Sequence, residues 1–148
     1  MQKNVVRIRR LEKSDMEQVI ELLQDISDFS PDRSLGDLFD DFKSQPTSEA
    51  LVAHIGTEIV GFGSIMMVRN IRGGLLGHVE DIVTKVNFRD QGVASAIIDS
   101  LCIAAQNLGC YKVVLASKSQ NVDFYKKKGF SHHGKSMKKE LAERHKST

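Results

Sequence analysis

The stretch NFRDQGVASAII, residues 87–98, marks the point where a turn gives way to a long helix. Arg89 and Gly92 stand in the turn, and the small Ala94 follows in the first helical turn. Backbone N–H groups at the start of a helix lack partners within the helix and lie at its electropositive end. With the Arg89 guanidinium beside them, they can bind an anion. One glycine is a weak signal, so the six residues RDQGVA are equally compatible with an ordinary helix start.

Hydrophobic periodicity around this stretch predicts an alternation of strands and helices. We expect strands over residues 5–10, 49–55, 58–69, 78–84, 110–116 and 130–139, and helices over 14–26, 34–46, 92–108 and 121–129. A capping box of Ser14 and Glu17 begins the first helix, Ser34 opens the second, and Asn121 caps the last. Gly56-Thr57 forms a two-residue hairpin turn. This order predicts an α+β fold with mixed α/β layers, in which about four helices flank a central, mostly antiparallel twisted sheet of about six to seven strands.

The bulk composition limits the class of protein. A chain of 148 residues with 41% hydrophobic residues favours one globular domain, over residues 1–140, with a flexible tail over 141–148. No apolar run is long enough to span a membrane, and the net charge of +2 is too small to indicate nucleic-acid binding. Two cysteines and a strand-like N-terminus favour a reducing compartment, so we expect a cytoplasmic protein, without excluding an organelle.

Two segments resemble a known superfamily. RDQGVA is similar to the R/Q-x-x-G-x-G/A signature of the GNAT acyl-CoA-dependent N-acyltransferases, with alanine in the last glycine position. NVDFYKKKGF, residues 121–130, resembles the tail motif of the same superfamily. The resemblance implies a GNAT fold and acetyl-CoA as co-substrate, with no metal. The residues that it places against the cofactor are Ile82, Val83, Thr84, Arg89, Asp90, Gln91, Gly92, Val93, Ala94, Ser95, Asn121 and Tyr125.

A narrower resemblance rests on three motifs in order: GHVEDIV (77–83), GCYKVVL (109–115) and NVDFYKKKGF. Together they resemble the glucosamine-6-phosphate N-acetyltransferase family. This implies N-acetylation of D-glucosamine 6-phosphate by direct attack in a ternary complex, feeding UDP-N-acetylglucosamine biosynthesis. It also implies a homodimer whose C-terminal segments contribute across the interface. The substrate-binding residues that it implies are Ser27, Arg69, Ile71, Arg72, Glu80, Asp81, Tyr111, Lys112, Lys138 and Lys139.

Acetyl transfer from a thioester to an amine assigns roles to a few groups. The reaction needs an unprotonated amine, a polarised carbonyl and a proton for the leaving thiolate. Tyr125 is the candidate acid, because a phenol is protonated at neutral pH. Glu80 is the candidate base, and the family resemblance implies that backbone N–H groups around Ile82 and Val83 polarise the carbonyl. Adjacent strand residues point to opposite faces, so we expect Val79, Asp81 and Val83 to face one way and Glu80 and Ile82 the other. We expect both acids to be buried among apolar neighbours.

Two departures from the family pattern leave assignments open. Ala116 stands where the family usually has an acidic residue, so the general base could be Glu80, a backbone carbonyl or water. The loop RGGLLG is one residue shorter than usual, which leaves open which residue between Arg69 and Gly74 contacts phosphate.

Other functions and sites remain as alternatives. A GNAT enzyme for a peptide N-terminus or a polyamine would fit the cofactor motifs, although the basic loop favours an anionic substrate. A non-catalytic acyl-CoA-binding module would fit Ala116, but not the retained Tyr125 and Glu80. His132 and His133 would alternate on a strand without a third ligand, so we expect no metal site. We expect Cys110 to be a packed thiol rather than a nucleophile.

Overall fold

Five strands form one sheet in the order β1-β2-β3-β4-β5 in the computed structural model, which describes residues 5–142. Neighbouring strands pair antiparallel, except that β4 and β5 are parallel. The strands are β1 (Arg7–Arg10), β2 (Ser48–Ile55), β3 (Glu58–Arg69), β4 (Leu75–Thr84) and β5 (Lys112–Val114). The helices are α1 (Met16–Leu23), α2 (Leu35–Ser44), α3 (Val93–Asn107) and α4 (Val122–Lys127). No helix among the described residues is long and apolar enough to cross a membrane.

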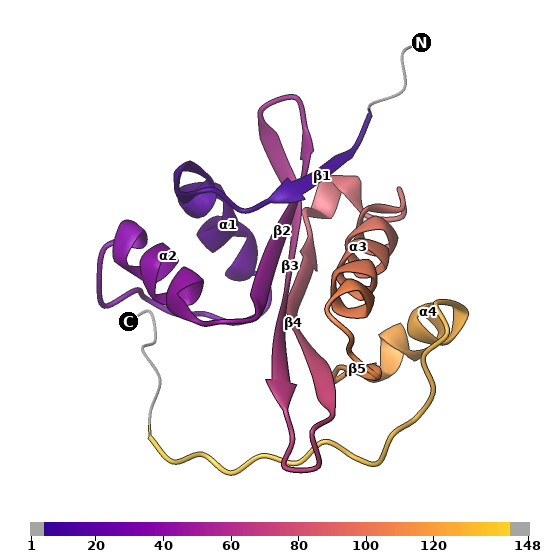
Figure 1. Cartoon of the computed structure of the whole chain (residues 1–148). Coiled ribbons are helices and arrows are strands. Elements are labelled where there is room, and N and C mark those ends of the chain that lie inside the picture. Colours follow the sequence, from indigo (N-terminus) through magenta and orange to yellow (C-terminus); the bar gives the residue numbers. More distant parts are fainter. Residues whose placement is uncertain (1–4, 143–148) are drawn as a thin grey trace.

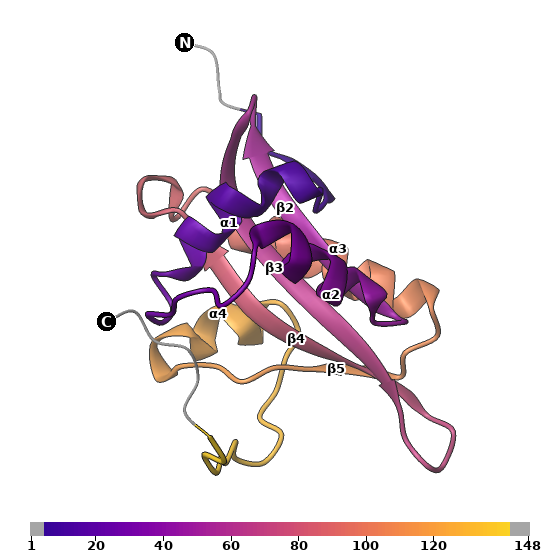
Figure 2. The ribbon, with the colours of Figure 1, turned by 90° about the vertical axis from the view of Figure 1, so that its left-hand side faces the viewer.

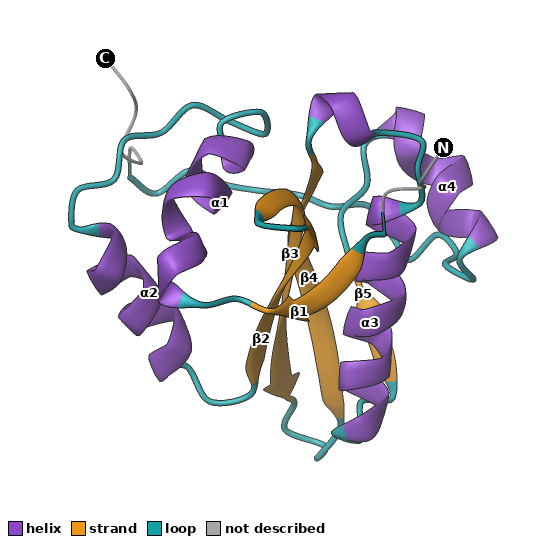
Figure 3. Ribbon diagram, turned by 90° about the horizontal axis from the view of Figure 1, so that it is seen from above, coloured by secondary structure: helices purple, strands orange, loops and turns teal. Residues whose placement is uncertain are grey.

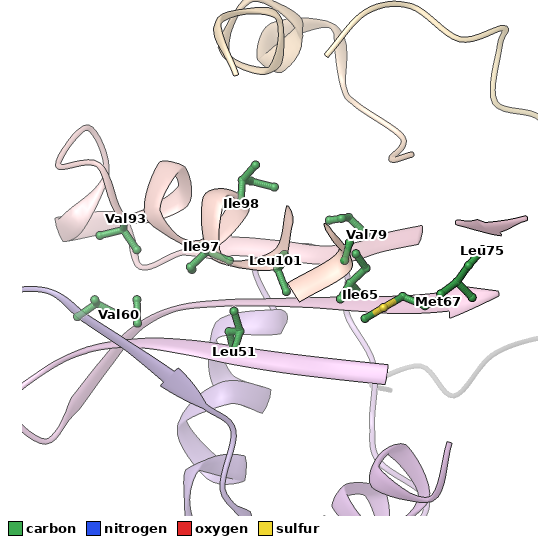
Figure 4. Close-up of a cluster of buried hydrophobic side chains, with 12 residues drawn as sticks. Leu51, Val60, Ile65, Met67, Leu75, Val79, Val93, Ile97, Ile98 and Leu101 are labelled. Atoms are coloured by element: carbon green, nitrogen blue, oxygen red, sulfur yellow. The ribbon is translucent and has the colours of Figure 1, made fainter. Parts of the chain in front are cut away.

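The helices cover both faces of the sheet and make three layers (Figures 1 and 3). α1 and α2 lie on one face, while α3 and α4 lie on the other. α3 packs closely because β3 has small residues beneath it: a Cβ added at Gly61 would lie 2.6 Å from a Val93 methyl carbon. Figure 4 shows the resulting core, in which Ile97 and Leu101 of α3 face the apolar side chains of β3.

The start of α1 differs from the prediction. A short 3-10 turn, Lys13–Asp15, precedes the helix, and the Glu12 N–H donates to the Asp15 carboxylate at 2.8 Å. The predicted capping box of Ser14 and Glu17 is therefore wrong: the capping box consists of Glu12 and Asp15, two residues earlier. Asp15 is buried, and both terminal nitrogens of Arg9 donate to it, at 2.6 and 2.9 Å. The hydrogen bond from Arg9 lowers the pKa of Asp15. The predicted cap of α2 is confirmed, because Ser34 accepts a hydrogen bond from the Asp37 N–H.

The sheet has fewer strands than the six to seven predicted. β5 covers three of the seven residues expected over 110–116, and no strand forms over 130–139. The chain from 131 to 142 is instead an exposed C-terminal arm, which crosses one end of the sheet towards the α1/α2 side (Figures 1 and 3). A strand requires a partner for its backbone groups, and this arm has none among residues 5–142.

A β-bulge in β4 changes which residues share a face. Ser64 lies opposite Glu80, but Phe62 lies opposite Val83, so β4 has one extra residue at this point. Asp81 adopts a left-handed backbone conformation with φ of 59°. The extra residue shifts the alternation by one, so Val79 packs beneath α3 while Val83 packs on the α1 side. The prediction that Val79, Asp81 and Val83 face one way is therefore wrong.

Candidate active site

β4 has an open edge beyond its pairing with β5. The parallel pairing ends at His78 opposite Val114, whereas β4 continues to Thr84. The two segments separate from there, and α4 lies beyond the separated part (Figure 2). We call this edge of β4 without a β5 partner, residues 79–84, the β4 opening. Ile82, Val83 and Thr84, which were predicted to contact the cofactor, all lie on this half of the strand. Unpaired backbone groups at a strand edge can hydrogen-bond an extended ligand.

The turn before α3 forms one end of this opening. Asp90 and Gly92 both have positive φ, 63° and 80°, and Gly92 is the N-cap without a side-chain hydrogen bond. The Ala96 N–H donates to the Gly92 carbonyl at 3.0 Å, so the N–H groups of residues 93–95 precede the first hydrogen bond inside the helix. A Cβ at Gly92 would meet no atom within 4 Å, so the turn requires glycine for its conformation rather than for space. The predicted cofactor residues 89–95 thus share one electropositive turn.

Tyr125 lies on α4 in an aromatic cluster. Its ring makes edge-on contacts with Phe124 and Phe130, at centroid distances of 5.0 and 5.6 Å, and it packs against the core beneath α3. Burial raises the pKa of the Tyr125 phenol, which keeps the hydroxyl protonated at neutral pH. Asn121 occupies the N-cap of α4, as expected, but its side chain does not cap the helix.

A lysine that the sequence did not single out connects these two helices. The Lys128 ammonium lies 2.7 Å from the Asp99 carboxylate and donates to the Ser95 hydroxyl at 2.7 Å. Both partners lie on α3, and Ser95 is in its first turn. Lys128 is the third lysine of a run, and no local pattern distinguishes it from its neighbours.

The acidic pair of β4 is exposed rather than buried. The prediction of burial is wrong because Glu80 and Asp81 stand at the bulge, where the sheet is open on one side. The alternation that would separate the two side chains is also broken there. The backbone at this point is held by the hydroxyl of Ser64, which donates to the Glu80 carbonyl at 3.2 Å.

The predicted phosphate ligands gather elsewhere, around the loop that joins β3 to β4. Arg69 donates to the Gly73 carbonyl at 2.7 Å, and Asn70 accepts hydrogen bonds from the backbone of Arg72 and Gly74. Exposed Ile71 lies in the same loop. Lys112 of β5 lies beside Leu76 of β4, four residues before Glu80, which is about 13 Å along a strand. The predicted site residues therefore form two groups: one along β4 and the turn before α3, and one around the loop between β3 and β4.

The remaining predicted substrate residues lie outside both groups or connect to the loop. Tyr111 contacts the loop, since the Asn70 amide donates to its hydroxyl at 3.5 Å. The Lys112 ammonium lies 5.3 Å from the centre of the Tyr111 ring and 3.4 Å from His133. Ser27 lies in the exposed turn after α1. Lys138 and Lys139 are exposed on the C-terminal arm, and the predicted tail beyond residue 142 lies outside the described residues.

Two minor expectations concern other side chains. Over residues 5–142, no group of three or more His, Cys, Asp or Glu side chains could hold a metal ion. His132 and His133 do not lie on a strand, so the predicted alternation of their rings does not apply. Burial raises the pKa of the Cys110 thiol, which is typical of a packed cysteine.

Known proteins share this architecture over nearly the whole chain. Residues 16–130 match the family described as acetyltransferase (GNAT) family. The chain is 33% identical over 141 residues to a glucosamine 6-phosphate N-acetyltransferase of Trypanosoma brucei brucei, covering 92% of this chain and 96% of that protein. The crystal structure of glucosamine-6-phosphate N-acetyltransferase from Arabidopsis thaliana has a TM-score of 0.87 at 28% identity, covering 93% of this chain and 99% of that one. A Trypanosoma brucei acetyltransferase structure has a TM-score of 0.85 at 31% identity, covering 93% and 100%.

Proposed function

The chain belongs to the acetyltransferase (GNAT) family, and on that premise we propose that it transfers the acetyl group of acetyl-CoA to the amine of D-glucosamine 6-phosphate. The products are N-acetyl-D-glucosamine 6-phosphate and CoA. The similarity to a glucosamine 6-phosphate N-acetyltransferase over 92% of the chain is the observation that carries the choice of substrate. The product would supply the synthesis of UDP-N-acetylglucosamine, and we propose that this occurs in the cytoplasm.

The cofactor side of the site fits acetyl-CoA. The turn before α3 offers three successive N–H groups, and Arg89 adds a positive charge, a combination suited to the CoA pyrophosphate. The open edge of β4 at Ile82–Thr84 offers backbone groups to the amide-containing pantetheine arm. Acetyl-CoA supplies an activated acyl group as a thioester, and the remaining chemistry falls to the side chains.

Three groups of the chain would carry the reaction. The Glu80 carboxylate accepts the proton of the substrate ammonium, directly or through water, which frees the nitrogen lone pair for attack. The N–H groups of Ile82 and Val83 donate to the carbonyl oxygen, where negative charge develops as the C–N bond forms. The Tyr125 hydroxyl then protonates the sulfur as the C–S bond breaks, and the second proton of the amine, released as the amide forms, restores the Tyr125 phenol. The half-buried, protonated state of Tyr125 supports this role.

A second copy of the chain would complete the substrate pocket. Lys112 lies opposite Leu76, about 13 Å along β4 from Glu80, and Arg69 lies opposite Leu75, one residue farther along. The exposed arm with Lys138 and Lys139 leaves the body of the protein after α4. We propose a homodimer in which this arm contributes across the interface and brings its lysines to the phosphate of the partner's substrate.

A thiol-release assay with acetyl-CoA tests the substrate. We expect rapid release with glucosamine 6-phosphate and slow release with glucosamine, spermidine or a short peptide. Release with a peptide or with unphosphorylated glucosamine, but not with glucosamine 6-phosphate, would assign a different amine. Acetyl-CoA binding by calorimetry without release in any arm would indicate a non-catalytic acyl-CoA-binding module.

Sedimentation of the full chain, together with kinetics of a variant carrying Lys138→Ala and Lys139→Ala, tests the dimer. We expect a dimer in which this variant raises KM for glucosamine 6-phosphate and leaves KM for acetyl-CoA unchanged. A monomer with full activity would contradict the shared pocket.

A further inference from the structure

Lys128 occupies an unusual position between the two helices that form the cofactor side of the site. Its side chain is 19% exposed, and its ammonium contacts Asp99 and Ser95 of α3 at 2.7 Å each. Ser95 and Asp99 are four residues apart, so they lie on one face of α3 and present two oxygens to one cation. A lysine gives up considerable side-chain entropy when it is held in this way.

The contact is not explained by the stability of α3. A cation near the N-terminal turn of a helix opposes the helix dipole, and Asp99 offsets only part of that cost. α4 has six residues and is too short to be stable without tertiary contacts. Lys128 is the C-cap of α4. Among the described residues, it is the one side chain of α4 and its C-cap that makes a polar contact with α3. The remaining attachment of α4 is the packing of its aromatic rings.

The backbone couples Lys128 directly to Tyr125. The Lys128 N–H donates to the Tyr125 carbonyl at 3.0 Å, and the Phe130 N–H donates to the same oxygen at 3.0 Å. A movement of Lys128 therefore moves the end of the helix turn that carries the tyrosine. At the other end of the contact, Ser95 belongs to the first turn of α3, whose free N–H groups would bind the cofactor under the proposed function.

We propose that Lys128 is a positioning residue, which by bonding to Ser95 and Asp99 holds the Tyr125 hydroxyl at a fixed place relative to the cofactor-binding turn of α3. This inference rests on the proposed acetyl transfer. It assigns to Lys128 no contact with either substrate. The separation of the acid from the leaving sulfur is the quantity that it controls, and small changes in such distances have large effects on rate.

Steady-state kinetics of Lys128→Ala, Lys128→Arg and Asp99→Asn test the proposal in the full-length enzyme. We expect Lys128→Ala to lower kcat by about tenfold to a hundredfold, with KM for glucosamine 6-phosphate unchanged. Lys128→Arg should recover most of the rate, because a guanidinium also reaches the two oxygens. Asp99→Asn should lower kcat less, and it tests the same contact from an exposed position if Lys128→Ala does not fold. Lys126→Ala removes a neighbouring charge from α4 and should leave kcat unchanged.

Titration of Tyr125 gives a readout that a purely structural role would not move. The chain has two tyrosines and no tryptophan, so a Tyr111→Phe background isolates the absorbance of Tyr125. Burial raises the pKa of this phenol above 10.0, and Lys128→Ala should bring it back towards that value as α4 loosens. A wild-type kcat and an unchanged titration in Lys128→Ala would overturn the proposal. A changed titration in a protein that does not acetylate glucosamine 6-phosphate would contradict the proposed substrate, while the positioning of Tyr125 would stand.

Discussion

The two halves of β4 differ although they belong to one strand. Residues 75–78 lie between β3 and β5, with Leu75 and Gly77 buried. Residues 79–84 pair with β3 alone, and they include the bulge at Asp81 and the exposed Glu80. The first half continues the core of the sheet, whereas the second half separates from β5 on the side of α4 (Figure 2). We call residues 75–78 the closed half of β4 and residues 79–84 the open half.

The difference shows how one strand can serve both stability and chemistry. Where strands flank β4 on both sides, its backbone groups have partners and the side chains have to fit a packed interior. Where one flank is missing, backbone groups can meet a ligand, and irregular conformations are tolerated beside the site. Substitutions in the first half should therefore affect stability, and substitutions in the second half should affect the rate.

The largest effect is expected from Glu80→Gln in the open half. Without a carboxylate to accept the ammonium proton, kcat/KM should fall by about a hundredfold or more. The midpoint of thermal unfolding should stay near that of the wild type, because the side chain is exposed. Glu17→Gln, an exposed acid on α1, is the matched control and should leave both quantities unchanged. An unaltered kcat/KM in Glu80→Gln would move the base role to water or to a backbone carbonyl.

Gly77→Val in the closed half should have the opposite signature. A Cβ at Gly77 would lie 2.6 Å from the terminal carbon of Ile65, so valine would overpack the core. We expect a loss of about 1–3 kcal/mol in the free energy of unfolding in urea, with kcat of the folded enzyme close to wild type. His78→Val changes the adjacent exposed position and should shift stability little. A loss of kcat at full stability in Gly77→Val would show that the two halves are not separate in function.

The sequence predicted the closed parts of the fold better than the open ones. The hairpin of β2 and β3 and the long α3 follow from local periodicity and turn residues, and the structure has both. The bulge at Asp81 depends on the pairing of β4 with β3, which no local sequence pattern indicates. For this reason the predicted orientation of Val83 and the predicted burial of Glu80 were both wrong. The C-terminal arm pairs with no strand among residues 5–142, so a strand-like pattern did not become a strand.

The site was predicted to a different extent. Family motifs indicated the turn at Gly92 and the tyrosine at 125; in the structure Gly92 is the N-cap of α3, and Tyr125 lies on α4 and packs against the core that α3 covers. Lys128 could not be found in this way. Its partners are 29 and 33 residues away on another helix, so only the packing of α4 on α3 brings them together.

Gly92→Ala tests the turn before α3, which follows the open half of β4 in the chain, and we expect a smaller effect. Alanine in the left-handed conformation costs about 1–2 kcal/mol, which the turn can avoid by tilting its N–H groups away. We therefore expect a modest loss of stability together with a higher KM for acetyl-CoA. Gly56→Ala imposes the same kind of strain, at φ of 58°, in the hairpin turn between β2 and β3. An equal rise of KM for acetyl-CoA in both variants would mean that strain alone, and not the cofactor-binding turn, is responsible.

The smallest expected effect is a change in how stability depends on pH, and it concerns the opposite edge of the sheet. The hydrogen bond from Arg9 lowers the pKa of Asp15 below its ordinary value of 3.8, so the folded state binds the Asp15 proton less readily than the unfolded chain. The stabilisation is therefore present above pH 3.8 and is lost as the pH falls through the lower folded pKa. Urea unfolding from pH 5 downwards should show a flatter dependence in Asp15→Asn than in the wild type. The pH profile of kcat/KM should be the same in both proteins, because Asp15 is bonded to Arg9 of β1, whereas Glu80 lies on β4 and Tyr125 on α4, and β2 and β3 separate β1 from β4. A shifted pH profile of kcat/KM in Asp15→Asn would mean that the β1 edge of the sheet influences the residues of β4 and α4.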